Sequence, residues 1–225
     1  MKVLSEHCAN NDTQIIQMRL DKMATFCYMV GDKSSKTCAL IDPAFDTKEI
    51  LNKVNSTGFT VTHLINTHNH ADHTAGNASI ISKTGAALYI HKLDAQKLTS
   101  IANRTFSRMI GGSKSPKPQT LLEDNDTINI GNTKLKVLHT PGHTPGGICL
   151  YMEGNVFTGD TLFVGAVGRT DLRGGSMRKL LKSVHEKIYT LPKETRVWPG
   201  HDYGGMPYST VENEMKTNPF TRRDL

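Results

Sequence analysis

A short run of the chain combines three histidines and one aspartate that could bind a metal ion. Within the segment Thr67–His73 these residues are His68, His70, Asp72 and His73. Side chains two positions apart in an extended loop point to the same side, so the first two rings can converge on one ion. The last two residues follow at once and can face a second centre. Neutral imidazole and carboxylate groups suit Zn, Fe or Mn, so the run predicts a metal site.

Three further segments each place a candidate ligand in a turn directly after an apolar stretch. The candidates are His143, in a turn rich in proline and glycine, Asp160 and His201. Any one of them alone is weak evidence, because a lone histidine or aspartate after a strand is more often a turn residue. Together with the first run they supply five histidines and two aspartates, which is enough for two adjacent metal ions.

These ligands need a framework of strands that delivers them to one place. Apolar or alternating stretches predict strands over residues 15–20, 25–30, 37–41, 62–66, 87–90, 127–130, 134–138, 148–152, 155–158 and 196–198. Helical periodicity predicts helices over residues 47–56, 74–84, 93–110 and 176–189. A last helix is expected from the capping box Ser209-x-x-Glu212. Strands in two groups, each followed by helices, indicate two sheets with helices outside.

Length and composition are those of an ordinary globular protein. The chain has 225 residues, 37% hydrophobic and 21% charged, and we expect a single domain over residues 1–225. The four cysteines are scattered, which favours reduced thiols over a disulfide framework. No apolar stretch approaches the ~20 residues that span a bilayer. The polar N-terminus lacks an apolar signal segment, so we expect a cytoplasmic location and no membrane partner.

The net charge of +6 comes from lysines and arginines that are dispersed along the chain. A nucleic-acid interface needs clustered cations, so we expect no nucleic-acid partner. We interpret the excess charge as mild attraction for a small anionic substrate. A solvated surface without functional meaning explains the excess equally well. A homodimer is a possible assembly.

The order and context of these motifs resemble the metallo-β-lactamase superfamily. The resemblance rests on the H-x-H-x-D-H run and on the Gly-containing turns that carry His143, Asp160 and His201, and it extends to Pro219. It implies an α/β fold, the αββα sandwich of two mixed sheets flanked by helices. The site is then expected at one edge of the sheets.

The resemblance also implies a role for each candidate ligand. Two divalent ions, Zn, Fe or Mn, would be bound. The first would be held by His68, His70 and His143. The second would be held by Asp72, His73 and His201. Asp160 would bridge the two ions.

Within the superfamily, the chain looks most like the glyoxalase II-type thioesterases and the persulfide dioxygenases. The segments Gly159–Phe163 and Gly168–Asp171 resemble both groups. The C-terminal segments His201–Tyr203 and Ser209–Glu212, with the Asn218-Pro219 pair, lean toward the dioxygenases. The insert from His91 to Gln119 resembles instead that of small bacterial glyoxalase II-like hydrolases.

Our first expectation is a metal-dependent hydrolase of thioesters such as S-acylglutathione. Two ions sharing a water would lower its pKa from ~15.7 to ~7, and the resulting metal-bound hydroxide would attack the thioester carbonyl. Asp72 and Asp160 are the expected catalytic carboxylates. Arg169 could anchor a carboxylate of a thiol-derived substrate such as a glutathione conjugate, although a salt bridge to Asp171 is nearly as well supported. Tyr203 could also contact this substrate, or could be a half-buried packing ring.

The alternative is a mononuclear Fe(II) persulfide dioxygenase that oxidises glutathione persulfide. Its iron would be held by His68, His143 and Asp160, a two-histidine, one-carboxylate set that leaves positions open for O₂ and substrate. The other four candidate ligands would then support the iron site without binding the iron. Both groups of enzymes keep all seven residues, so the motifs do not separate the two activities. A non-catalytic module would be expected to lack some of them.

Overall fold

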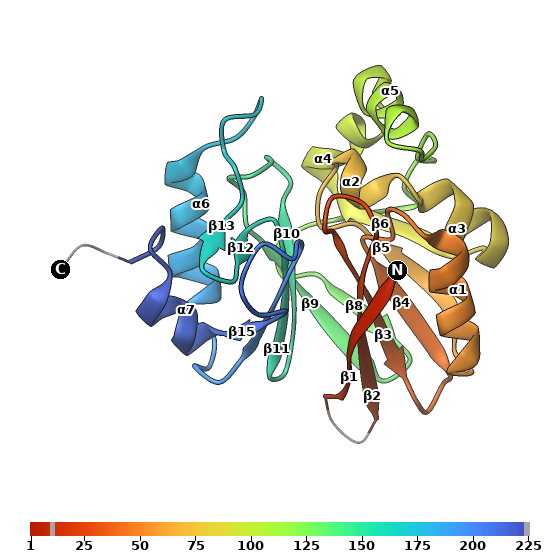
Figure 1. The fold of residues 1–225 in the computed structure, drawn as a ribbon, viewed down its shortest axis with the longest axis horizontal. Coiled ribbons are helices and arrows are strands. Elements are labelled where there is room, and N and C mark those ends of the chain that lie inside the picture. Colours follow the sequence, from red (N-terminus) through yellow and green to blue (C-terminus); the bar gives the residue numbers. More distant parts are fainter. Residues whose placement is uncertain (10–11, 223–225) are drawn as a thin grey trace.

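Two β-sheets packed against each other form the core, with helices covering their outer faces (Figure 1). The computed structural model describes residues 1–9 and 12–222. This is the expected sandwich of two mixed sheets flanked by helices. Within the described residues, no helix combines the length and the apolar character that crossing a bilayer requires.

The larger sheet has seven strands, in spatial order from β1 to β7. Strands β1 to β4 pair antiparallel, whereas β4 to β7 pair parallel. The strands are β1 (Lys2–Cys8), β2 (Thr13–Arg19), β3 (Phe26–Asp32), β4 (Thr37–Ile41), β5 (Thr60–Ile65), β6 (Ala87–His91) and β7 (Thr120–Leu122).

The second sheet has six strands, in the order β15-β14-β11-β10-β9-β8, and only the β11–β14 pair is parallel. Its strands are β8 (Thr127–Ile130), β9 (Thr133–His139), β10 (Ile148–Met152), β11 (Asn155–Gly159), β14 (Arg196–Pro199) and β15 (Ser209–Thr210). A separate small hairpin consists of β12 (Leu162–Phe163) and β13 (Ala166–Val167).

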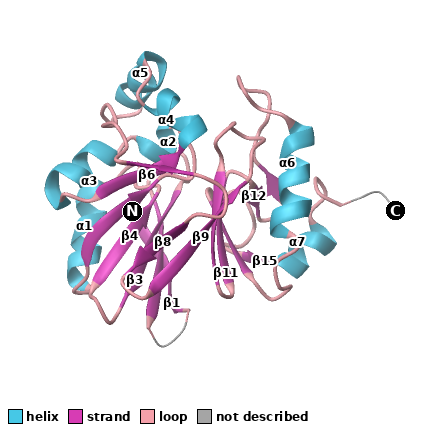
Figure 2. Ribbon diagram, turned by 180° about the vertical axis from the view of Figure 1, so that it is seen from behind, coloured by secondary structure: helices cyan, strands magenta, loops and turns pink. Residues whose placement is uncertain are grey.

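Helices lie on both outer sides of this sandwich. Helices α1 and α3 cover one side, α6 and α7 cover the other, and α4 and α5 stand at the top edge (Figure 2). The helices are α1 (Thr47–Ser56), α2 (Ala71–Thr74), α3 (Asn77–Thr84), α4 (Lys92–Leu98), α5 (Ile101–Met109), α6 (Met177–Ser183), the π-helix η1 (Val184–Ile188) and α7 (Val211–Thr217).

The central strands are apolar at almost every position because both of their faces are buried. In β2, Ile15 points into the cluster between the sheets, whereas its neighbour Ile16 points toward helices α1 and α3. Val30 and Met29 in β3 divide in the same way. Successive side chains of a strand point to opposite faces, so continuous apolar runs are what a sheet covered on both sides requires.

Some predicted elements differ from the structure at their ends. The helix predicted over residues 93–110 is interrupted at Thr99, and Ser100 starts a new helix by accepting a hydrogen bond from the backbone N–H of Asn103. The last helix is capped by Thr210, whose hydroxyl accepts from the N–H of Asn213, rather than by Ser209. These differences arise because several Ser and Thr residues near each boundary can cap, and tertiary packing selects one.

Strand β1 is absent from the sequence-based prediction. Its residues Lys2–Cys8 are a mixture of polar and apolar side chains that are exposed or only partly buried, because β1 is the outermost strand and pairs with β2 alone. The N-terminal segment therefore lacks the apolar pattern that reveals the inner strands. Of the four free cysteines, Cys8 on this strand is exposed, and the other three are buried.

A buried carboxylate joins the two sheets at the end of β3. Asp32 Oδ1 accepts hydrogen bonds from both hydroxyls of Ser34 and Ser35 and from the backbone N–H of Ser35. Its Oδ2 accepts from the N–H of Asn132 and the hydroxyl of Thr133, in the other sheet. Burial raises the pKa of Asp32, but these hydrogen bonds outweigh it and hold the pKa below its ordinary value.

We expect Asp32→Ala to lower the free energy of unfolding by about 2–4 kcal/mol at pH 7, because buried N–H groups lose their acceptor. The lowered pKa means that this stabilisation is present above about pH 4 and is lost as the pH falls further. Urea unfolding of both proteins at pH 7 and pH 3 measures the effect. An equal difference at the two pH values would contradict this assignment.

Candidate metal centre

The predicted ligands meet at one edge of the sandwich, where several strands end. The loop after β5 carries His68 and His70 and leads into α2, which carries Asp72 and His73. The other three ligands follow β9, β11 and β14, and they are His143, Asp160 and His201. Strands from both sheets therefore deliver ligands to a common site.

The ligand atoms form two groups with a carboxylate between them. Within each group the atoms lie within 4.8 Å of one another, and the groups are His68, His70, His143 and Asp72, His73, His201. Asp160 Oδ2 lies 3.4 Å from Nε2 of His143 and 3.4 Å from Nε2 of His201. Its Oδ1 lies 3.3 Å from Nε2 of His73. The structure thus brings all seven predicted residues together and places Asp160 between the two groups.

Backbone carbonyls fix the orientation of two of the imidazole rings. His143 Nδ1 donates a hydrogen bond to the carbonyl of Arg169 at 2.7 Å, and His201 Nδ1 donates to that of Met23 at 3.0 Å. A neutral imidazole carries only one N–H, so donation from Nδ1 leaves a lone pair on Nε2. Both Nε2 atoms are therefore acceptors that face the centre of the site.

Asp42 orients two more rings, and sequence reasoning missed it. Its Oδ2 accepts from His73 Nδ1 at 3.0 Å and from the Thr67 hydroxyl at 2.6 Å, and its Oδ1 accepts from the Thr67 N–H. Since the Thr67 hydroxyl proton is used on Asp42, that oxygen accepts from His68 Nδ1 at 3.1 Å. Asp42 directly follows an apolar strand, the same pattern that identified Asp160, and this signal could have found it.

The resulting arrangement suits a cation. His68 Nε2 is buried and has no hydrogen-bond partner among residues 1–9 and 12–222. The Nε2 atoms of His73 and His201 lie only 3.0 Å apart, although the Nδ1 atom of each ring already donates elsewhere. Lone pairs that converge in this way need a shared proton or a metal ion. The residues present therefore fit a divalent metal, and the site is a metal-binding cluster of histidine and aspartate.

Burial and neighbouring charge set the protonation of the cluster. Burial, with help from His73, lowers the pKa of His68 well below its ordinary value. Burial and then His143 lower the pKa of His70 to about 4. Burial also acts to lower the pKa of His73, but Asp160 and Asp42 outweigh it and raise that pKa well above the ordinary range. Metal binding at His73 must therefore release a proton.

The two predicted substrate-binding residues lie differently at the site. The ring of Tyr203 is stacked on that of His201, with centroids 4.6 Å apart and an interplanar angle of 3°, and it is 59% exposed. Arg169 makes a bidentate ion pair with Asp171 at 2.8 and 2.7 Å, and both side chains are exposed. The salt bridge considered for Arg169 is thus present, while its carbonyl supports His143.

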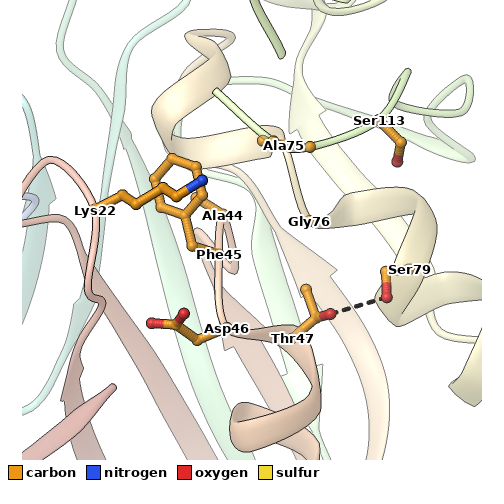
Figure 3. Close-up of a pocket in the computed structure, with 11 residues that line it drawn as sticks. Lys22, Ala44, Phe45, Asp46, Thr47, Ala75, Gly76, Ser79 and Ser113 are labelled. Atoms are coloured by element: carbon orange, nitrogen blue, oxygen red, sulfur yellow. Dashed lines mark hydrogen bonds between the residues drawn. The ribbon is translucent and has the colours of Figure 1, made fainter. Parts of the chain in front are cut away.

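A pocket of about 340 Å³ is lined in part by Ala75 and Gly76, just past the end of α2 (Figure 3). Lys22 reaches over Phe45 there, and Thr47 is hydrogen-bonded to Ser79. Its lining residues, all in the described part of the chain, include none of the seven candidate ligands. We therefore place the chemistry at the metal centre and not in this pocket.

We expect Asp42→Ala to weaken metal binding by about 10–100-fold, because His73 and Thr67 lose the group that orients them. Competition with a chromophoric chelator measures the affinity. Asp46→Ala is a suitable control, since Asp46 also follows β4 but binds the N-terminus and the Asp21 N–H instead. Equal metal affinity in Asp42→Ala and wild type would contradict the role given to Asp42.

Comparison with known proteins finds relatives that align along most of the chain. The mitochondrial persulfide dioxygenase ETHE1 of Bos taurus is 34% identical over 220 residues, which are 96% of this chain and 79% of the relative. The crystal structure of ETHE1 from Myxococcus xanthus is 30% identical, with a TM-score of 0.75, and covers 91% of this chain and 83% of that one.

Two further solved structures are similar. BLEG-1, described as a B3 metallo-β-lactamase, has a TM-score of 0.83 and 32% identity, over 92% of this chain and 99% of that one. TTHA1623 in a di-iron-bound form has a TM-score of 0.73 and 29% identity, over 96% of this chain and all of that one.

These relatives correct the first functional expectation. The prediction of a metallo-hydrolase that cleaves thioesters is wrong, because relatives about 34% identical over most of the chain are named persulfide dioxygenases. The motifs did not reveal this, because the resemblance implies the same seven ligands for both activities. The finding agrees with the alternative.

The family is shown independently of any one relative. A model described as the metallo-β-lactamase superfamily matches residues 20–201, a stretch that contains all seven candidate ligands. The fold, with its two mixed sheets and flanking helices, agrees with this match. The chain belongs to the metallo-β-lactamase superfamily.

Proposed function

We propose that this protein is a persulfide dioxygenase that acts on a small thiol persulfide, such as glutathione persulfide. The observation that carries the proposal is the 34% identity, across 96% of the chain, to an enzyme of that name. In the proposed reaction, both atoms of O₂ are added to the terminal sulfur. Water then cleaves the sulfur–sulfur bond, so that one persulfide, one O₂ and one water yield one thiol and one sulfite.

The proposed cofactor is one Fe(II), held by His68, His143 and Asp160. The rings of His68 and His143 have centroids 4.7 Å apart, and Asp160 Oδ2 lies 3.4 Å from His143 Nε2. The unpartnered Nε2 of His68 completes the set. When bound, iron with two imidazoles and one carboxylate supplies open positions for O₂ and for the substrate sulfur.

The remaining polar residues of the centre hold this set in place and shape its surroundings. His73 is fixed between Asp42 and Asp160. The ring of His201 packs against those of Phe163 and Tyr203, which also contact each other. The exposed hydroxyl of Tyr203 is well placed to donate a hydrogen bond to the thiol carrier. In this proposal the only partner is a small thiol-derived anion, and the reaction takes place in the cytoplasm.

Metal content and two matched variants test the proposal. We expect wild-type protein purified without added metal to contain about one iron per chain, to consume O₂ with glutathione persulfide and to leave S-acylglutathione intact. His73→Ala should keep about one iron and lose about 10–100-fold in activity, because the iron ligands are untouched. Asp160→Asn should lose iron and nearly all activity, because an amide is a poor ligand for a cation.

Other outcomes would contradict specific parts of the proposal. Two metal ions per chain in the wild type, falling toward one in His73→Ala, would replace the single iron with a dinuclear centre. A lack of O₂ uptake with any persulfide by the iron-loaded protein would reject the dioxygenase activity itself. Far-UV circular dichroism establishes that each variant is folded before its activity is compared.

We expect Arg169→Ala to raise KM for glutathione persulfide while kcat stays nearly constant. A carboxylate anchor contributes equally to substrate and transition-state binding, so its loss appears in KM. Arg173→Ala is the matched control, because Arg173 lies in the same loop and, among residues 1–9 and 12–222, its only hydrogen bond is the one that its carbonyl accepts from Lys97. Unchanged KM in Arg169→Ala would show that the ion pair with Asp171 is its whole role.

A further inference from the structure

A fully buried carboxylate outside the ligand set is hydrogen-bonded to the loops that form the metal centre. Asp94 is in the first turn of α4 and is 0% exposed. It belongs to the insert between β6 and β7, which the sequence analysis connected with no part of the site. Burying a carboxylate is costly unless hydrogen bonds replace its water, so its partners indicate what it stabilises.

Within the described part of the chain, the four hydrogen bonds to its carboxylate come from two loops that carry metal ligands. Asp94 Oδ2 accepts from the backbone N–H of Asn69 at 3.0 Å and from the Asn69 side-chain amide at 2.6 Å. It also accepts from the Thr144 hydroxyl at 2.8 Å, and Oδ1 accepts from the Gly146 N–H at 2.7 Å. Asn69 lies between His68 and His70, and Thr144 directly follows His143.

One carboxylate therefore ties together two loops that are about 75 residues apart in the sequence. The atoms that these loops present to the metal centre, His70 Nδ1 and His143 Nε2, lie 2.9 Å apart. These two nitrogens form a hydrogen bond when His70 carries its proton on Nδ1, but a metal ion held by both rings displaces that proton, so other contacts must then keep the loops together. Charge-assisted hydrogen bonds, which are roughly twice as strong as neutral ones, can do so.

Two neighbouring residues support this interpretation. A Cβ atom on Gly146 would lie 2.7 Å from Asp94 Cγ, so only glycine permits this close approach of the loop to the carboxylate. Asn103 of α5 donates a hydrogen bond to the carbonyl of Asn69 at 2.9 Å. Both helices of the insert, α4 and α5, therefore hydrogen-bond to the loop that carries His68 and His70.

We propose that Asp94 is a positioning residue that sets the spacing between the His68–His70 loop and the His143 turn. It binds neither metal nor substrate, and it acts through Asn69 and Thr144. The proposal depends on the metal centre and not on which reaction the centre catalyses. It gives the α4–α5 insert a role as a structural support of the metal site.

The test compares Asp94→Asn with Asp32→Asn in the full chain. Asp32 is the matched control, because it is also a buried aspartate that joins distant loops. It lies at the C-terminal end of β3, about 20 Å along the strand from the end that adjoins the metal centre. Co²⁺ is the probe, and the measurements are its affinity, its visible absorption spectrum and the Tm of each protein with and without it.

We expect both variants to have a lower Tm than wild type without metal. Asp94→Asn should bind Co²⁺ about 10–100-fold more weakly, with an altered visible spectrum and a smaller rise of Tm on adding Co²⁺. Asp32→Asn should keep the wild-type affinity and spectrum. If Asp94→Asn has a lower Tm but keeps the wild-type Co²⁺ affinity and spectrum, Asp94 stabilises only the fold and the proposal is overturned.

Thr144→Val keeps the proposal testable if Asp94→Asn does not fold. This change removes one of the two bonds between Asp94 and the His143 turn and preserves the shape of the side chain. We expect it to weaken Co²⁺ binding by about 3–10-fold, the usual effect of losing one hydrogen bond. Wild-type Co²⁺ affinity and spectrum in folded Thr144→Val would overturn the proposal.

Discussion

The structure of this protein depends on a set of imidazole lone pairs that are held close together. The Nε2 atoms of His73 and His201 are 3.0 Å apart, and His70 Nδ1 is 2.9 Å from His143 Nε2. Without a metal each of these pairs needs a shared proton, and a bound cation replaces it, so the rest of the fold must hold these rings in place. The positions of the ligands are therefore formed before any substrate is present.

Buried carboxylates and backbone carbonyls keep these rings in position. Asp42 orients His73 directly and His68 through Thr67, while the carbonyls of Met23 and Arg169 orient the rings of His201 and His143. Each of these acceptors lies at or near the end of a strand, where the chain leaves the rigid core. The two sheets therefore serve as a frame that fixes the ends of loops, and the loops present the ligands.

The same geometry accommodates more than one chemistry, which explains why the first functional expectation was wrong. All seven residues suit either two ions with a shared water or one iron with supporting groups. The seven ligands alone do not separate these cases. The persulfide dioxygenase of Bos taurus is 34% identical over 96% of this chain, so the similarity extends well beyond the ligand set.

Local sequence patterns were enough to predict the cluster of metal ligands and the framework of inner strands. Both depend on local patterns, namely the spacing of His68, His70 and His73 and the apolar runs of strands buried on two faces. Edge strand β1 escaped prediction because its residues carry no such pattern. Asp42 shares the strand-end pattern of Asp160, but its contacts with His73 and Thr67 became visible only in the tertiary structure, because these partners lie tens of residues away. Asp94 carries no such signal, because an aspartate in a first helical turn has an ordinary local explanation. The protonation of the rings also depends on the tertiary structure, because distant residues supply the hydrogen-bond partners of three of the Nδ1 atoms.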